Sequence, residues 1–282
     1  MLKRLLRALI PHRLWTKLRL MRMRAHVEGY AHRRVSHMYG PFRLEIELAD
    51  GMGEGWYDHD WPELPELRLM TQHHPIGWGG RIFDLGAHQG VVALMLSRYV
   101  GASGEVVAVE ASSHNAAAAH RNVQLNDARN CTILHAAIAE RSGKLLFNKC
   151  LNGFVDDGTG EWGQIEVDAF SIDDLAARFG NPNLLFIDVE GYECRALAGA
   201  SNTLLTKPDV FVEVHLGAGL EKFGGSVEQV LHFFSRSDYT LYFNVEGGLE
   251  FCRFDSLEEL PKHRFFLFAI AKVGSTPLNS RV

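Results

Sequence analysis

The sequence has few cysteines and no long apolar run, and both absences narrow the class of protein. Its four cysteines, Cys131, Cys150, Cys194 and Cys252, include no C-x-x-C pair, which argues against a disulfide framework and against a zinc site of the usual spacing. We expect buried, reduced thiols in a cytoplasmic protein. No apolar run reaches the length of a bilayer span, and the N-terminus lacks the continuous apolar core of a secretory signal.

Charge is unevenly distributed along the 282 residues, whose net charge is −5. Every charged residue in 1–24 is Lys or Arg, and Leu2, Leu5, Leu6 and Leu9 recur at helical spacing, so a basic amphipathic arm is predicted for residues 1–40. Such a helix can lie peripherally on an anionic membrane surface or pack on the acidic remainder of the chain, and the sequence leaves both open. The acidic remainder argues against nucleic acid as a partner. The oligomeric state is not predicted.

The most informative stretch is an apolar run, 81–85, that leads into the turn Asp84-x-Gly86-Ala87-x-x-Gly90. A second apolar run, 105–110, ends at Glu110. A strand, a glycine turn, a helix and an acid after the next strand are typical of the nucleoside-binding half of a doubly wound α/β domain. Glycines let the backbone approach a ligand closely, and the carboxylate suits a ribose diol.

The turn also indicates which cofactor is bound. A dinucleotide site has three glycines, but Asp84 stands where the first would be. A carboxylate there repels phosphates and attracts a cation such as the ammonium or sulfonium of S-adenosylmethionine. Gly86, Ala87, His88 and Gly90 are therefore predicted to shape the cofactor pocket, with Asp84 at its amino-acid end. Glu110 is predicted to bind the ribose, and Ala111, Ala136 and Ala137 to border adenine.

Strands and helices alternate through the rest of the chain. Strands are predicted at 41–48, 81–85, 105–110, 131–135, 144–148, 165–167, 183–189, 209–215, 239–245 and 264–271, and helices at 90–100, 113–126, from 172, 193–206 and 226–237. Residues 50–62 are predicted to be a loop or short hairpin that covers a ligand cleft, or else a plain connector with aromatics in the core, and 151–163 are predicted to be an exposed loop. The pattern predicts an α/β fold with a doubly wound, seven-stranded, mostly parallel sheet and an antiparallel C-terminal hairpin. The predicted divisions are the arm (1–40), a lead-in strand and cap loop (41–78), the catalytic domain (79–275) and a tail (276–282).

Polar residues close the strands at the edge where ligands bind in such sheets: Asp84, Glu110, His135, Asp188 and His215. Gly191 permits a tight turn that points Asp188 and Glu190 into the cleft, and Glu213 shares a strand face with His215. We predict Asp188, Glu190, Glu213 and His215 as catalytic residues, with Asp188 or His215 as general base. A hydrogen bond between Glu213 and His215 that only organises the strand ends is the alternative.

Metal binding is not predicted from any ligand motif. Oxygen and nitrogen donors are present at these positions, so a divalent metal stays open, but no compact spacing specifies its geometry.

These residues resemble the FkbM family of S-adenosylmethionine-dependent methyltransferases, which have a Rossmann-like class I fold. The resemblance covers about 81–215 and rests on Phe83 to Gly90, Val109-Glu110, Asn122-x-x-x-Asn126, Ile187 to Glu193, Leu197-x-Gly199-Ala200 and Glu213-Val214-His215. One departure is His88, where the family usually has Asn. The resemblance implies O-methylation, often of a sugar, glycan or natural-product hydroxyl.

Two other functions use the same half-sheet. An NAD-dependent oxidoreductase is the first, although the missing glycine argues against it. The second is a non-catalytic binding module that is tethered by its basic arm.

Overall fold

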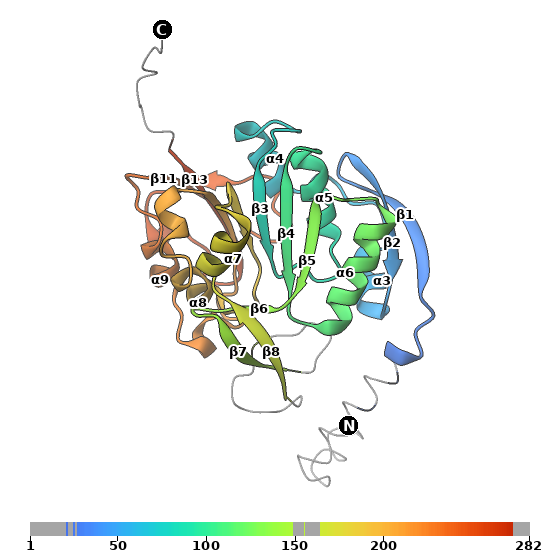
Figure 1. The fold of residues 1–282 in the computed structure, drawn as a ribbon. Helices are drawn as coiled ribbons and strands as arrows, with labels where there is room; N and C mark the ends of the chain where they lie inside the picture. Colours follow the sequence, from blue (N-terminus) through green and yellow to red (C-terminus); the bar gives the residue numbers. More distant parts are fainter. Residues whose placement is uncertain (1–20, 22–24, 26, 149–154, 156–163, 273–282) are drawn as a thin grey trace, which may run out of the picture.

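The computed structural model describes residues 21, 25, 27–148, 155 and 164–272 (Figure 1). Residues 1–20, 22–24 and 26 of the predicted arm lie outside the described residues, so its membrane role stays a prediction. Cys150 and most of the loop predicted at 151–163 also lie outside them. In the part of the chain that is described, no helix has the length and hydropathy of a membrane span. Cys131 is buried as expected, whereas Cys252 is exposed, because it lies on a short strand at the sheet edge.

The described residues build a mixed sheet of eight strands in the order β12-β11-β13-β10-β9-β3-β4-β5. Five of these, β5, β4, β3, β9 and β10, run parallel, and β13 is antiparallel to both β10 and β11. The strands are β3 (Arg81–Leu85), β4 (Glu105–Glu110), β5 (Cys131–His135), β9 (Leu184–Ile187), β10 (Asp209–Val214), β11 (Tyr239–Asn244), β12 (Cys252–Arg253) and β13 (Phe265–Ala271). The doubly wound sheet is confirmed. The prediction of seven strands missed β12, whose two residues are too few to show an alternating pattern.

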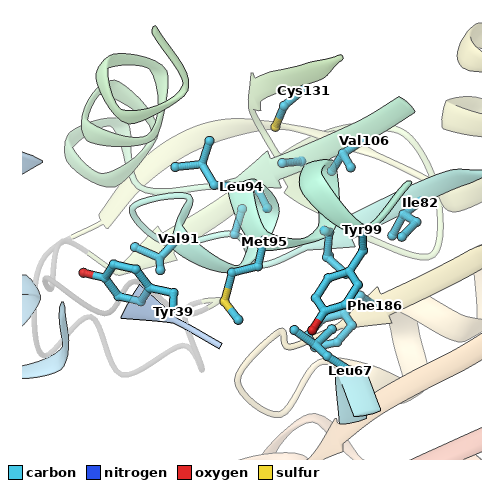
Figure 2. Close-up of a cluster of buried hydrophobic side chains, with 14 of the residues drawn as sticks. Tyr39, Leu67, Ile82, Val91, Leu94, Met95, Tyr99, Val106, Cys131 and Phe186 are labelled. Atoms are coloured by element: carbon cyan, nitrogen blue, oxygen red, sulfur yellow. The ribbon is translucent and has the colours of Figure 1, made fainter. Parts of the chain in front are cut away.

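Helices cover both faces of this sheet (Figure 1). Side chains of α4 (Pro65–His73), α5 (Val91–Val100) and α6 (Ser113–Leu125) form one core with alternate strand residues such as Ile82 and Phe186. Figure 2 shows part of this cluster, in which Met95 and Tyr99 of α5 lie among side chains from several elements. The other face packs Phe83 and Ile187 against α7 (Ile172–Phe179), α8 (Glu193–Ala198) and α9 (Val227–His232). Burial on both faces explains why the central strands are apolar throughout.

The lead-in segment differs most from its prediction. Its strand β2 (Phe42–Leu48) is confirmed, but it pairs antiparallel with β1 (Arg33–Tyr39), which was placed in the arm. The expected loop after it contains a helix, α3 (Gly51–Tyr57). Three glycines lower its helix propensity, yet the Asp50 carboxylate caps it by accepting from the N–H groups of Met52 and Gly53.

The asparagines of the N-x-x-x-N segment attach this hairpin to the sheet domain. Asn122 Oδ1 accepts from the N–H of Glu47 at 2.7 Å, and Asn126 Oδ1 accepts from the N–H of Glu45 at 3.0 Å. Asn126 also donates to the carbonyl of Glu45. One turn of α6 separates the two side chains, so they meet alternate residues along the free edge of β2.

Two predicted helices are shorter in the structure. The helix expected at 193–206 ends at Ala198 and resumes as a 3₁₀ helix, η1 (Thr203–Thr206), because the Asp173 carboxylate accepts from the N–H groups of Asn202 and Thr203. The helix expected at 226–237 ends at His232. A helix does begin after Ser171, whose hydroxyl caps α7 as predicted.

A second, three-stranded sheet lies beside the large one in the order β6-β8-β7. It consists of β6 (Ala137–Ile138), β7 (Gly143–Asn148) and β8 (Gln164–Phe170). The 3₁₀ helices η2 (Leu220–Phe223) and η3 (Leu257–Glu259) complete the regular elements in the described ranges.

Candidate functional site

A cavity opens where β3, β4 and β9 end, at the edge predicted for ligand binding. It holds about 640 Å³ of space, with the solvent at its mouth included. Its lining residues are Trp56, Gly86, His88, Val109, Glu110, Ala111, Ala136, Ala137, Ile138, Phe147, Val155, Asp188, Val189, Glu190 and Tyr192. Most of the predicted cofactor and catalytic residues are therefore brought to one place, with Asp84, Ala87, Gly90, Glu213 and His215 behind the lining.

The glycine turn after β3 holds its shape through close backbone contacts. The N–H groups of Gly86 and Ala87 both donate to the carbonyl of Val109, at 2.9 and 3.0 Å. Gly86 has φ +107°, and a Cβ there would lie 1.7 Å from the carbonyl oxygen of Asp188. A side chain at this position would push β3 and the segment after β9 apart, so the turn requires glycine.

Glu110 presents its carboxylate to the cavity from the end of β4. Its side chain is 7% exposed. Oε2 accepts from the N–H of His88 at 2.8 Å and Oε1 from the N–H of Ser112 at 2.7 Å. Burial nevertheless raises the pKa of Glu110 to about 7, because these hydrogen bonds offset only part of the desolvation. The carboxylate is thus held rigidly, with lone pairs left for hydroxyl donors.

Asp84 is buried behind the residues that line the cavity. Its side chain is 3% exposed, and Oδ2 has no hydrogen-bond partner. Burial first, and the neighbouring Glu110 charge second, raise its pKa to about 7. A buried carboxyl oxygen without a partner is costly unless a ligand or a proton satisfies it.

His88 occupies a backbone conformation that explains the departure from the family pattern. Its φ is +47°, a region that Asn and His enter more readily than most residues. Nδ1 lies 2.7 Å from the Tyr57 hydroxyl, and the ring is tilted against Trp56. Burial lowers the pKa of His88 to about 4, so the ring is neutral at physiological pH. Nε2 is buried without a partner.

Apolar side chains also line the cavity. Ala111, Ala136 and Ala137 lie there as expected, together with Ile138 and Phe147, which were not predicted. The alanines were indicated by their place just after strand ends, where small side chains leave room for adenine. Phe147 belongs to the small sheet, whose position no local pattern reveals. His135 is exposed and pairs with the carbonyl of Ala111, so it takes no part in the lining.

Carboxylates surround one imidazole beyond the end of β9. Asp188 and Glu190 both line the cavity. Glu190 and Gly191 have left-handed backbone conformations, which turn the chain after β9. His215 Nε2 lies 3.7 Å from Asp188 Oδ1, 3.4 Å from Glu190 Oε2 and 3.5 Å from Glu213 Oε1. The four predicted catalytic residues therefore form one group, called here the acidic cluster.

Glu193 is the residue of this region that the sequence argument missed. It is fully buried at the start of α8, and its Oε1 lies 2.7 Å from His215 Nδ1. The hydrogen bond expected between Glu213 and His215 is thus made by Glu193 instead. Its place in the Ile187 to Glu193 segment was a signal, but a glutamate on a helix is usually read as a solvated residue.

Electrostatics in the acidic cluster follow from the crowding of like charges. Burial alone would lower the pKa of His215, but the hydrogen bond to Glu193 and the charges of Glu193 and Asp188 outweigh it and raise the pKa to about 9. Desolvation, followed by the Glu213 charge, raises the pKa of Asp188 well above its usual value. Arg264 Nη1 lies 3.2 Å from Glu213 Oε1.

Three side chains of the acidic cluster have donor atoms close enough to be considered as metal ligands, a possibility that the sequence left open. One donor atom each from Asp188, Glu213 and His215 lie within 4.8 Å of one another. Asp188 follows β9, whereas Glu213 and His215 lie at the end of β10, 25 or more positions later in the sequence. A compact sequence motif therefore could not reveal them.

Comparison with known proteins agrees with this geometry. The sequence profile of the FkbM methyltransferase domain matches residues 84–241, more than half of the chain. No curated protein sequence matches.

Solved structures of similar shape include three bacterial methyltransferases. One is assigned as an O-methyltransferase from Klebsiella pneumoniae (15% identity, 74% of this chain and 79% of that chain, TM-score 0.44). Another is the O-methyltransferase from Bacillus cereus in complex with SAH (14%, 74% and 80%, 0.42). The third is an SAM-dependent methyltransferase from Aquifex aeolicus (16%, 73% and 88%, 0.39). On the match of its own sequence, the chain belongs to the FkbM family of S-adenosylmethionine-dependent methyltransferases.

Proposed function

We propose that the protein is an O-methyltransferase that modifies a hydroxyl of a sugar, glycan or natural-product acceptor. The observation that carries the proposal is the position of the acidic cluster, whose Asp188 and Glu190 line the same cavity as Glu110 and the glycine turn. An alcohol is barely ionised at neutral pH, so its methylation benefits from an oxygen base beside the cofactor. Family membership favours methyl transfer over an NAD-dependent oxidoreductase and over a non-catalytic module.

The cavity fits an adenosyl cofactor. Glu110 offers an anchored carboxylate to the ribose diol, and Ala111, Ala136 and Ala137 offer an apolar wall to adenine. The unpartnered Asp84 Oδ2 and His88 Nε2 lie near the turn made by Gly86, Ala87 and Gly90, where the amino-acid end would be held. When bound, S-adenosylmethionine supplies an electrophilic methyl group on a sulfonium.

The acceptor hydroxyl would meet Asp188. Its side chain is 39% exposed, while its Oδ1 is buried towards His215, so the second carboxylate oxygen is the one that an acceptor can reach. His215 is 2% exposed and does not line the cavity, so it contacts the carboxylates rather than the acceptor. We therefore assign the base to Asp188, with Glu190 orienting the acceptor and Glu213 and His215 positioning both. Alignment of the hydroxyl with the methyl group provides much of the rate.

A labelled methyl donor tests this proposal. The chain is incubated with methyl-¹³C S-adenosylmethionine and separate panels of sugars, glycans, polyhydroxylated natural products and amines, and the products are read by NMR. We expect an O-methyl product, lost in Asp188→Asn while affinity for S-adenosylhomocysteine is kept. Glu250→Gln, which removes an exposed carboxylate, is the control. Methylation of amines alone, or full turnover by Asp188→Asn, would contradict the proposal.

A further inference from the structure

The acidic cluster has features that a proton-transfer site alone does not require. We propose that Asp188, Glu213 and His215 bind a divalent metal cation at the acceptor end of the cavity. Binding of the cation follows from the cluster itself, whereas its use in catalysis rests on the proposed methylation of a hydroxyl.

The spacing of the donor atoms supports a cation. The distances from His215 Nε2 to Asp188 Oδ1 and Glu213 Oε1, 3.7 and 3.5 Å, are longer than good hydrogen bonds. They are close to the separation of neighbouring ligands around one metal, about 3.0 to 3.4 Å for bonds of about 2.1 Å. All three donors lie within 4.8 Å of one another, so closer approach of the two carboxylates to His215 would bring them into one coordination shell.

His215 provides an independent sign of a ligand. Its side chain is 2% exposed, yet Nε2 has no hydrogen-bond partner and faces the carboxylates. On the other side of the ring, Nδ1 lies 2.7 Å from Oε1 of the fully buried Glu193. A carboxylate that accepts from one ring nitrogen is the usual support of a metal-binding histidine. A bound ion would take the place of the proton on Nε2, and Glu193 would keep the proton on Nδ1. Glu193 Oε1 also accepts from the N–H of Gly191, so its position is well determined.

The local charge also favours a divalent cation over a single proton. Asp188, Glu190, Glu193 and Glu213 all lie around His215, whose ring carries a positive charge while its pKa stays raised. Among the described residues, Arg264 also contacts Glu213 from outside the cavity. Carboxylates crowded in this way repel one another strongly where water is scarce. A divalent ion among them would remove the repulsion.

The donor set indicates the class of metal. Carboxylate oxygens suit Mg²⁺ and Mn²⁺, and an imidazole shifts the preference from Mg²⁺ towards Mn²⁺ or Zn²⁺. Asp188 and Glu190 are partly open to the cavity, which leaves coordination positions for an acceptor. There the ion would bind and polarise the acceptor hydroxyl as a Lewis acid, while the second oxygen of Asp188 takes its proton.

The test is Mn²⁺ binding to the full chain, without cofactor or acceptor, measured by EPR and calorimetry after chelator treatment. Glu213→Gln and Glu246→Gln form a matched pair, because both carboxylates contact Arg264 but only Glu213 faces the cluster. We expect one Mn²⁺ per chain, binding at least tenfold weaker in Glu213→Gln and unchanged in Glu246→Gln. A ¹⁴N coupling to the bound ion should disappear in His215→Gln.

Folding of each variant is followed by circular dichroism. Mn²⁺ should also raise the melting temperature of the unaltered chain, a measurement that needs no substitution. Absence of binding at millimolar Mn²⁺, or binding without the ¹⁴N coupling, would overturn the metal site. Neither result bears on methyl transfer itself, so failure of this proposal is distinguishable from failure of the proposed function.

Discussion

Glu110 should make binding of the adenosine part of the cofactor pH-dependent. Its pKa is raised to about 7 by burial, and only the ionised carboxylate can accept two hydrogen bonds from a ribose diol while it holds the N–H groups of His88 and Ser112. The carboxylate is protonated as pH falls through about 7, so affinity should decrease in that direction. A group of that pKa predicts a Kd about tenfold weaker at pH 6 than at pH 8.

The titratable groups that face Glu110 decide how this is measured. Asp84 lies beside it with a pKa also near 7, Tyr57 is a neutral phenol, and His88 is neutral above a pKa of about 4. The probe is methylthioadenosine, which carries the ribose diol but lacks the amino-acid part expected near Asp84. Calorimetry at pH 6, 7 and 8 then reports on Glu110, and Asp84→Asn should leave the pH dependence in place.

The matched variant is Glu110→Gln. Glutamine keeps one acceptor oxygen and so loses one charge-assisted hydrogen bond, which contributes about 1.5–3 kcal/mol. Affinity at pH 8 should therefore fall roughly ten- to a hundredfold and lose its pH dependence. Because Glu110 also accepts from the N–H groups of His88 and Ser112, the melting temperature of the variant is measured as a control. An unchanged value shows that the turn is still folded. Affinity that is constant between pH 6 and 8 in the unaltered chain would refute the reasoning.

Three further substitutions test the site. Asp84→Asn should be more stable than the unaltered chain at pH 8, by up to about 4 kcal/mol, and equally stable near pH 4. The reason is that a carboxyl group with a raised pKa lowers stability increasingly as pH rises from about 4 to 7. Denaturant unfolding at both pH values measures the difference, and the same difference at each would contradict the prediction. Gly86→Ala should prevent folding, since its Cβ would lie 1.7 Å from the Asp188 carbonyl oxygen, whereas Gly55→Ala, with open space around it, should be neutral or slightly stabilising by thermal melting. His88→Asn should keep affinity for S-adenosylhomocysteine, and His88→Val should weaken it, because a β-branched residue is strained at φ +47°; equal affinities would show that this backbone conformation does not matter.

The central strands were predictable because burial on both faces produces apolar runs. β3 and β4 begin and end where the sequence placed them. Elements stabilised by tertiary contacts were not predictable. The polar strand β1 depends on pairing with β2, and α3 depends on the Asp50 cap and on close packing of Gly53 against Gln89.

The site followed the same division. Glycines and acids at strand ends indicated Gly86, Glu110 and Asp188, because topology brings the ends of parallel strands together. Trp56 comes from α3, and its place in the lining could not be derived from spacing. The Glu193 to His215 hydrogen bond joins a helix to a strand end, and the grouping of Asp188, Glu213 and His215 likewise exists only after folding.

The most direct test of the account is a crystal structure of the chain with S-adenosylhomocysteine bound. We predict the ribose hydroxyls on Glu110, adenine against Ala111, Ala136 and Ala137, and the sulfur facing Asp188 across the cavity. A cofactor bound elsewhere, or one whose sulfur faces away from the acidic cluster, would contradict it.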